Sequence, residues 1–348
     1  MPIAPAASKS LDGELEAKVR FLLQPASYPE PTQGVSAIET HMSWVFLTDH
    51  FAYKLKKPVR FPFLDFSTVE LRKHFCEEEI RLNRRLAPRV YIGTLPMTAA
   101  EGGAMSIAGT GPAIDWLVKM HRLNADRMLD YAIKHGTATH EDIDRLAGRL
   151  AAFYRAAPPV EITPIEYRQR FEADVTANLE ELSKFRSVLE PDAVERIHSR
   201  QFAVLRDASW LFDRRVAEHR IVEAHGDLRP EHVLLEPEPQ IIDCLEFKFE
   251  FRVLDPVDEL AFLGVECEML GAPDVGIAVL DRYRRSTGDD PPSRLIDFYK
   301  CYRACLRSKI SIWHIQEPNI RDPARWPALA KRYLDLADRH ATKLSLAS

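Results

Sequence analysis

Short apolar runs bounded by turn residues dominate the chain from residue 35 to residue 120. Val45-Phe46-Leu47 and Phe51 to Leu55 are typical of two strands that the turn Thr48-Asp49-His50 connects. Residues 68–86 change to helical spacing, and Pro88 follows that predicted helix. Two more strands are predicted near 90–97 and 113–120, joined by a glycine-rich loop. This region therefore predicts strand, strand, helix, strand, strand.

The remaining chain is mostly helical in its pattern. Before residue 35 the sequence predicts a loose arm over residues 1–10, a short amphipathic helix over 11–23 and a proline-rich linker over 24–34. After His121, apolar residues at helical spacing predict helices around 146–153 and 171–182, one long helix over 197–212, and another over 296–314. Strands return only at 220–224, 231–235 and 240–244. The predicted divisions are 1–34, 35–120 and 121–348.

Length and charge narrow the class of protein. A chain of 348 residues is about twice the usual domain size, which favours two domains or lobes. Lys and Arg number 47 against 52 Asp and Glu, a net charge of −5, which argues against a nucleic acid or an anionic membrane as partner. The apolar run Phe21-Leu22-Leu23 is too short for a signal peptide or a membrane span. We therefore expect a cytoplasmic protein, while its oligomeric state stays open.

Five cysteines are scattered along the chain. Their odd number and irregular spacing fit neither a disulfide framework nor a zinc site, and free cysteines are usually buried. The sequence therefore predicts buried structural thiols in a reducing compartment; they are Cys76, Cys244, Cys267, Cys301 and Cys305.

Two aspartates carry the clearest chemical signal. Asp227 lies in His225-Gly-Asp227-Leu-Arg229-Pro-Glu-His232, and Asp243 ends Ile241-Ile242-Asp243. Each follows an apolar strand and begins a turn, which places a carboxylate rigidly at a loop tip. Phosphoryl transfer uses one carboxylate to orient the attacking hydroxyl and another to hold a metal on the phosphates.

These motifs resemble those of a known superfamily. H-G-D-L-R-P-E-H resembles the catalytic loop of protein kinases, and more closely the H-G-D form of the aminoglycoside phosphotransferases. Ile-Ile-Asp243 resembles their metal-binding segment, and Asp255-Pro-Val-Asp258-Glu-Leu-Ala their D-P-x-x-D/E-L-A run. W-V-F-L, Y-K-L-K-K-P-V and N-R-R-L-A-P resemble a bacterial group of phosphotransferase-like proteins, some with a further P-loop domain. No G-x-x-x-x-G-K-[ST] occurs here, so the resemblance implies the kinase-like part alone.

The resemblance implies a fold and a set of roles. The fold is α+β, two-lobed and protein kinase-like, with a small antiparallel-sheet N-lobe that carries one helix and a mainly helical C-lobe. Lys54 would bind the α- and β-phosphates of ATP, and Glu79, chosen over Glu78 by its spacing from Leu86, would hold Lys54. Asp227 would orient the acceptor hydroxyl, Arg229 would face the transferring phosphate, and Asp243 would bind Mg²⁺.

Two further segments complete the implied ATP site. Residues 38–44, which include Ser43 and contain no glycine, would cover the phosphates. Residues 115–121, which include Met120, would form the hinge and offer backbone groups to adenine. Lys56, Lys57 and Arg60, beside Lys54, are interpreted as a solvated basic edge.

Several alternatives remain open. His232 occupies the position of the kinase asparagine and is either a metal ligand, with Mn²⁺ then possible beside Mg²⁺, or a hydrogen-bonded support of the loop. The acidic stretch from Asp243 to Glu268, which includes Glu246, favours a cationic acceptor, whereas Arg303 and Arg307 could face an anionic metabolite.

The preferred hypothesis is a phosphotransferase that moves the γ-phosphate of Mg-ATP to a hydroxyl of a small molecule whose identity the sequence leaves unknown. The alternatives are a pseudokinase-type nucleotide-binding regulatory protein and a nucleotidyl transferase on the same fold.

Overall fold

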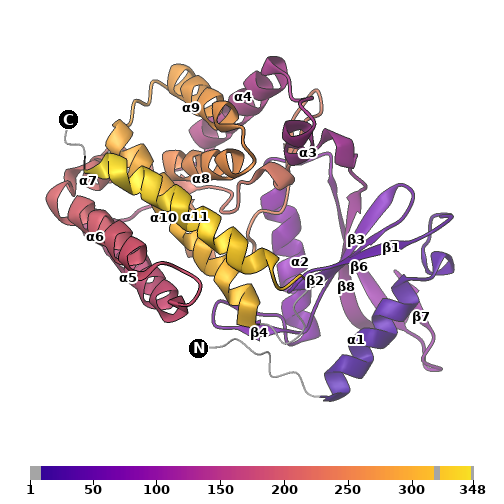
Figure 1. Cartoon of the computed structure of the whole chain (residues 1–348). Coiled ribbons are helices and arrows are strands. Elements are labelled where there is room, and N and C mark those ends of the chain that lie inside the picture. The colour runs from indigo at the N-terminus through magenta and orange to yellow at the C-terminus, as the bar shows by residue number, and fades with distance from the viewer. Residues whose placement is uncertain (1–8, 317–321, 346–348) are drawn as a thin grey trace. The chain divides into compact units, whose positions relative to one another are not determined.

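The computed structural model describes residues 9–316 and 322–345 and divides the chain into two units (Figure 1). Unit 1 runs up to Arg127 and also takes in Pro239–Glu250; unit 2 consists of Met128–Glu238 and the chain from Phe251 onwards. The sequence placed 239–250 in its second half, whereas the contacts of this segment assign it to unit 1. The predicted arm lies outside the described residues over positions 1–8.

A six-stranded antiparallel sheet forms the centre of unit 1, in the order β1-β2-β3-β8-β6-β7. Its strands are β1 (Ser36–Glu39), β2 (Ser43–Leu47), β3 (Phe51–Lys56), β6 (Tyr91–Ala99), β7 (Met105–Ile107) and β8 (Ala113–His121), and a small pair is formed by β4 (Arg60–Phe61) and β5 (Leu64–Asp65). The four predicted strands are confirmed. The sequence missed β7 because three residues inside a glycine-rich loop carry too little pattern.

Side chains of β3 alternate between two cores, as the two-residue period of a strand requires. Tyr53 and Leu55 are buried in one core, with Leu22 at the end of helix α1 (Lys9–Leu22). Ala52 belongs to the other core, where Cys76 and Ile80 of helix α2 (Val69–Asn83) pack. Lys54 and Lys56 share the parity of Ala52, so both lie on the face that α2 covers. This placement brings two lysines of one strand toward one helix.

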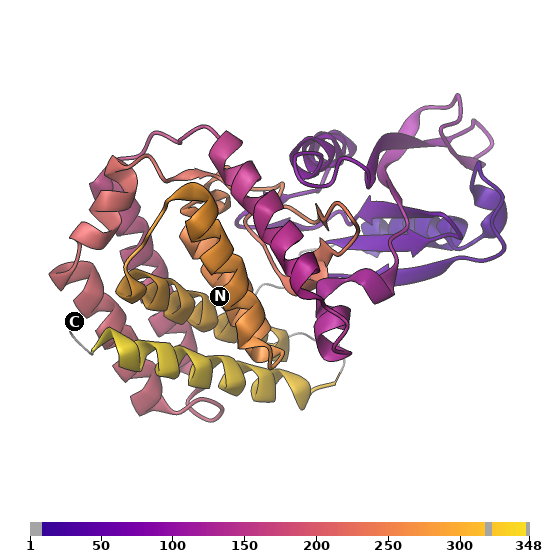
Figure 2. The ribbon, with the colours of Figure 1, turned by 90° about the horizontal axis from the view of Figure 1, so that it is seen from above.

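Helices make up most of unit 2. They are α3 (Leu129–Lys134), α4 (His140–Ala156), α5 (Pro164–Leu182), α6 (Pro191–Asp207), α7 (Trp210–Ala217), α8 (Pro256–Met269), α9 (Pro273–Thr287), α10 (Ser293–Trp313) and α11 (Arg325–Leu344). Figures 1 and 2 both show α10 and α11 lying side by side, and their residues are in extensive contact. The only strands of the described part of unit 2 are β9 (Val222–Glu223), which pairs with β12 (Val253–Leu254), and β10 (Val233–Leu234); β11 (Gln240–Ile241) belongs to unit 1.

Short 3-10 turns supplement these elements; they are η1 (Pro25–Ser27), η2 (Ala125–Arg127), η3 (Ser183–Phe185), η4 (Pro230–His232), η5 (Phe249–Phe251) and η6 (His314–Gln316). The α+β fold class with a mainly helical second half is confirmed. No helix of the described residues is long and apolar enough to cross a bilayer. All five cysteines are free and buried, as predicted.

Two predictions of elements were wrong in extent. The long helix expected over 197–212 is two helices, because Ala208 leaves the helical conformation with φ −131° and ψ 36°. Leu205 and Phe212 are buried on either side of this break, so the apolar pattern runs through it. The three strands expected between 220 and 244 each shrink to two residues, although apolar side chains of all three runs, such as Ile221, Leu235 and Ile241, are buried.

Candidate functional site

In unit 1, Lys54 of β3 and Glu79 of α2 form an ion pair. The Lys54 Nζ lies 2.9 Å from Glu79 Oε1, and the Glu79 side chain is buried. Glu78 instead pairs with Arg81 at the surface. The helical period turns Glu79 toward the sheet and its neighbour Glu78 outward, so the structure places Glu79 against Lys54.

Asp243 lies in the same unit and against the same lysine. Its Oδ1 is 2.9 Å from Lys54 Nζ, while the Asp243 side chain is 46% exposed. Its backbone has φ +62°, a left-handed conformation that asparagine and aspartate tolerate better than other residues with a side chain. A half-exposed carboxylate on a constrained turn is thus presented next to a lysine.

Backbone hydrogen bonds attach the Asp243 turn to unit 1 at successive points. The amide of Asp243 donates to the Tyr91 hydroxyl at 3.1 Å, and the amide of Cys244 donates to Asn83 Oδ1 at 2.9 Å. Asn83 ends α2, the helix that also carries Glu79. The sequence analysis gave Tyr91 and Asn83 no role, although Asn83 begins the N-R-R-L-A-P run, because both act on backbone groups far away in the chain.

The sequence analysis interpreted Lys56 as a solvated residue, and this prediction was wrong. Its side chain is 0% exposed, its Nζ lies 2.6 Å from Glu79 Oε2, and it is also bonded to Glu246 Oε1. The alternation of β3 explains the error, because Lys54 and Lys56 share the face that α2 covers. We refer to Lys54, Lys56, Glu79, Asp243 and Glu246 as the lysine–carboxylate cluster.

Charges in this cluster stabilise one another. Burial lowers the pKa of Lys54 and of Lys56, but the neighbouring carboxylates outweigh it and raise both above the ordinary lysine value. Burial likewise favours the neutral form of Glu79, yet the two lysines hold its pKa below the usual range. Lys54, Lys56 and Glu79 are therefore charged near neutral pH, and each of these buried charges has a partner of opposite sign.

In unit 2, the candidate residues lie in the loop around Asp227. Glu259 of α8 accepts hydrogen bonds from the amides of His225 at 3.0 Å and Gly226 at 2.6 Å, and from the Tyr154 hydroxyl at 2.7 Å. Gly226 has φ +91°, which a side chain would strain. Glu259 thus fixes the backbone that leads into Asp227. The sequence analysis had assigned it no role, although it lies within the D-P-V-D-E-L-A run.

Arg229 and His232 complete this loop. Arg229 Nε lies 3.0 Å from Asp227 Oδ1, and Nη2 of Arg229 lies 3.0 Å from Nε2 of His232. His232 Nδ1 lies 2.9 Å from the backbone oxygen of Asp227. Both ring nitrogens of His232 therefore have partners within the loop, which favours the interpretation as a loop support over that as a metal ligand.

The chain was compared with protein-family models and with known proteins. No protein-family model matches the chain. Uncharacterised proteins of Mycobacterium tuberculosis and Mycobacterium bovis are 32% identical over 307 residues, which is 87% of this chain. The chain spans 59% of the length of these relatives.

Solved structures of small-molecule kinases superpose on nearly the whole chain. A choline kinase of Cryptosporidium parvum matches with a TM-score of 0.54 at 12% identity, covering 96% of this chain and 95% of its own. A choline/ethanolamine kinase family protein of Mesorhizobium loti matches at 0.52 and 14%, covering 96% and 99%. A thermostable mutant of an aminoglycoside phosphotransferase matches at 0.53 and 11%, covering 92% and 98%. The chain has their protein kinase-like fold.

Within this kinase-like fold, the two residues suggested for ATP binding besides Lys54 and Glu79 are buried. Ser43 begins β2 opposite Lys56, after a tight turn in which its amide donates to Thr40 Oγ1 at 3.0 Å. Met120 lies in β8, and its side chain joins the core under α2. The expected hinge 115–121 lies within β8, where pairing with β3 and β6 uses its backbone groups. The chain leaves this strand only after His121.

The two arginines suggested for the substrate, Arg303 and Arg307, form different ion pairs. Arg303 is buried, and its Nε and Nη2 donate to Asp258 at 2.7 and 2.6 Å, an arrangement that serves the core of unit 2. Arg307 Nε lies 2.8 Å from Glu266 Oε1, and Asp227 is near enough to contribute to raising its pKa, although burial opposes this. Arg307 therefore lies near the loop that carries Asp227, whereas Arg303 joins α10 to α8.

The donor atoms suit a hard cation. Among the residues that the structure describes, no three His, Cys, Asp or Glu side chains gather as a metal site. Mg²⁺ is commonly held by one or two carboxylates together with substrate phosphates and water, so a ready-made protein cage is not required. The half-exposed carboxylate of Asp243 fits this mode of binding.

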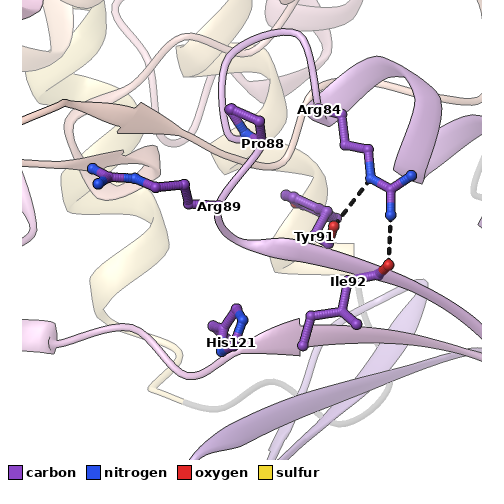
Figure 3. A pocket seen from close by; sticks show the side chains of 6 residues that line it. All are labelled: Arg84, Pro88, Arg89, Tyr91, Ile92 and His121. Atoms are coloured by element: carbon purple, nitrogen blue, oxygen red, sulfur yellow. Dashed lines mark hydrogen bonds between the residues drawn. The ribbon is translucent and has the colours of Figure 1, made fainter.

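A hollow of about 660 Å³ lies on unit 1 (Figure 3). It is lined by Arg84, Pro88, Arg89, Tyr91, Ile92 and His121. Arg84 donates to the backbone oxygens of Tyr91 and Ile92, as the dashed lines of Figure 3 mark. Tyr91 thus borders this hollow while its hydroxyl holds the amide of Asp243. No residue of the lysine–carboxylate cluster lines this hollow.

Proposed function

We propose that this protein is an ATP-dependent phosphotransferase that moves the γ-phosphate of Mg-ATP to a hydroxyl group of a small molecule. The observation that carries the proposal is the position of Lys54, which lies 2.9 Å from both the buried Glu79 and the half-exposed Asp243. A lysine fixed by one carboxylate and placed beside a second is suited to bind phosphates next to a metal ion. The kinase-like fold supports the same conclusion.

Residues of unit 1 would bind the nucleotide. The ammonium group of Lys54 is a compact charge suited to the α- and β-phosphates, and Glu79 would keep it extended from β3. Asp243 would supply carboxylate oxygens for Mg²⁺ or Mn²⁺. The bound ion would neutralise charge on the phosphate oxygens.

Residues of the catalytic loop would act on the acceptor. Asp227 would accept a hydrogen bond from the acceptor hydroxyl and take up its proton as the oxygen bonds to the γ-phosphorus. The bond between that phosphorus and the β–γ bridging oxygen breaks, and ADP leaves. Arg229, 3.0 Å from Asp227, would stabilise the transferring phosphoryl group, because a guanidinium offers several donors to its oxygens.

The first experiment is calorimetry of ATP binding with and without Mg²⁺, on wild type, Asp243→Asn and Asp227→Asn. We expect Mg²⁺ to strengthen ATP binding by wild type, Asp243→Asn to lose this effect, and Asp227→Asn to keep it. Transfer would then be measured against amino alcohols, aminoglycosides and sugars, with Asp227→Asn expected to abolish it.

Other results would contradict the proposal in different ways. Wild type that binds no ATP in either condition would exclude a kinase. Binding without transfer to any acceptor would favour the regulatory pseudokinase. Mass spectrometry that finds AMP rather than phosphate on the acceptor would identify a nucleotidyl transferase.

A further inference from the structure

Lys56 is the most completely buried charged side chain of the lysine–carboxylate cluster, and the proposed reaction gives it no contact with ATP. Its side chain is 0% exposed, whereas that of Lys54 is 14% exposed. Placing an ammonium group out of water is costly unless its partners are well arranged. Lys56 has such partners in Glu79 and Glu246, so the fold maintains a second buried lysine two residues after the first.

Glu79 is shared between the two lysines in a specific way. Its Oε1 faces Lys54 at 2.9 Å, and its Oε2 faces Lys56 at 2.6 Å. With each oxygen engaged by a different strand residue, the carboxylate cannot rotate without breaking an ion pair. Lys56 therefore orients the group that orients Lys54.

Glu246 connects the same lysine to the segment that carries Asp243. Glu246 lies three residues after Asp243 and is bonded to Lys56. The amides of Asp243 and Cys244 donate to Tyr91 and Asn83. The segment is thus attached to unit 1 at its start and again at Glu246. The second attachment depends on Lys56.

The charges of the cluster give Lys56 a further reason to be present. The cluster holds two lysines and three carboxylates, so it is negative overall. When Lys54 binds a phosphate, its charge is shared with that anion. If Lys56 were absent, the carboxylates of Glu79 and Glu246 would then be left in a buried site without another cation. With Lys56 present, both carboxylates keep a positively charged partner.

We propose that Lys56 is a positioning residue of the phosphate-binding apparatus, which holds Glu79 toward Lys54 and, through Glu246, keeps the Asp243 segment attached to β3. This role rests on the proposed ATP-dependent function and deepens it. The Y-K-L-K-K-P-V run contains the signal, since two lysines at the two-residue spacing of a strand share one face.

The test compares three variants of the full chain. Lys56→Met removes the shared cation, and Glu246→Gln removes only one of its partners with little change of shape. Lys300→Met is the control, because Lys300 is a largely buried lysine, 14% exposed like Lys54, that pairs with Glu268 at 2.6 Å in unit 2. Each variant is characterised by the dissociation constant of ATP with and without Mg²⁺, and by hydrogen exchange of the peptide 239–250 without nucleotide.

We expect Lys56→Met to weaken Mg-ATP binding by about 10- to 100-fold, as is typical when a residue that orients a metal or phosphate ligand is lost. ATP binding without Mg²⁺ should weaken less, so the gain from Mg²⁺ shrinks. Peptide 239–250 should exchange faster in Lys56→Met and in Glu246→Gln than in wild type, and Lys300→Met should change neither quantity.

The proposal is overturned if Lys56→Met and Glu246→Gln keep the wild-type gain from Mg²⁺ and the wild-type exchange of 239–250. If Lys56→Met does not fold, Glu246→Gln alone decides between these outcomes. Failure of the proposed function gives a different result, because wild type would then bind no ATP, while the exchange of 239–250 still tests the attachment through Lys56.

Discussion

Glu259 is a buried carboxylate whose oxygens are satisfied mainly by uncharged donors. The amides of His225 and Gly226 and the hydroxyl of Tyr154 all point at it. Burial raises the pKa of Glu259, while these donors act in the opposite direction. An anion that accepts several short hydrogen bonds in a dry site holds its donors firmly. The backbone before Asp227 is therefore fixed by a side chain of α8.

Replacing Glu259 with glutamine should slow turnover without weakening ATP binding. Glutamine has one acceptor oxygen, so one of the two amides would face an NH₂ group and the His225–Asp227 turn would loosen. We expect turnover to fall about 10- to 100-fold, by analogy with other residues that orient catalytic groups. Steady-state kinetics and calorimetry would separate the two effects.

Tyr154→Phe is the matched control, because it removes one donor to Glu259 and leaves both amide hydrogen bonds in place. Its turnover should fall much less. Equal turnover of Glu259→Gln and wild type would contradict the positioning of Asp227 by Glu259.

At the residue scale, the motifs singled out some side chains that lie together in the structure, but not partners that come from elsewhere in the chain. Lys54 and Asp243 were both singled out, and the structure brings them to 2.9 Å. Glu246 was interpreted only as part of the acidic stretch from Asp243 to Glu268, whereas its partner Lys56 lies on strand β3. A local pattern does not contain that pairing.

At the scale of helices, apolar spacing located α4, α5 and α10 but not the ionic contacts that join helices. Such contacts gather at His340 of α11, whose ring nitrogens lie 2.8 Å from Asp297 of α10 and 3.1 Å from Glu268 of α8. Lys300 also pairs with Glu268 at 2.6 Å. One carboxylate of α8 is thereby connected to both α10 and α11.

Glu268 should make the stability of unit 2 depend on pH in the acid range. Burial raises its pKa, but hydrogen bonds from His340 and Lys300 outweigh this and lower it from 4.5 to about 2. A carboxyl with a lowered pKa in the folded state contributes stability that is complete above its unfolded value and is lost as pH falls toward the folded value. This contribution should therefore be present above pH 4.5 and disappear toward pH 2.

Thermal unfolding of wild type and Glu268→Gln would measure this contribution. The variant should melt below wild type at pH 7, and the difference should shrink steadily as pH is lowered from 4.5 to 3. Glu141→Gln is a suitable control, since Glu141 forms an exposed ion pair with Arg145, a kind of contact that contributes little. A melting difference that stays constant from pH 7 to pH 3 would contradict the role of Glu268.

At the scale of the whole chain, the segment that carries Asp243 belongs with the unit that carries Lys54. Pro239–Glu250 follows the Asp227 loop in sequence, yet its contacts assign it to unit 1. The amide of Ile241 donates to the backbone oxygen of Leu86, that of Asp243 to the Tyr91 hydroxyl, and that of Cys244 to Asn83 Oδ1. Sequence order alone suggested the opposite assignment, because these contacts connect positions about 150 residues apart in the chain.

Hydrogen exchange can test this assignment through two core substitutions. Leu55 is fully buried in unit 1 and Leu146 is fully buried in unit 2, and replacing either with alanine should cost about 2–5 kcal/mol. Amides exchange through openings of the cooperative unit that contains them. Leu55→Ala should therefore accelerate exchange in 239–250 along with strands β2, β3 and β8, whereas Leu146→Ala should accelerate α4 and leave 239–250 nearly unchanged. Exchange of 239–250 that follows Leu146→Ala would instead assign the segment to the helical unit, and Asp243 would then be carried by the same body as Asp227.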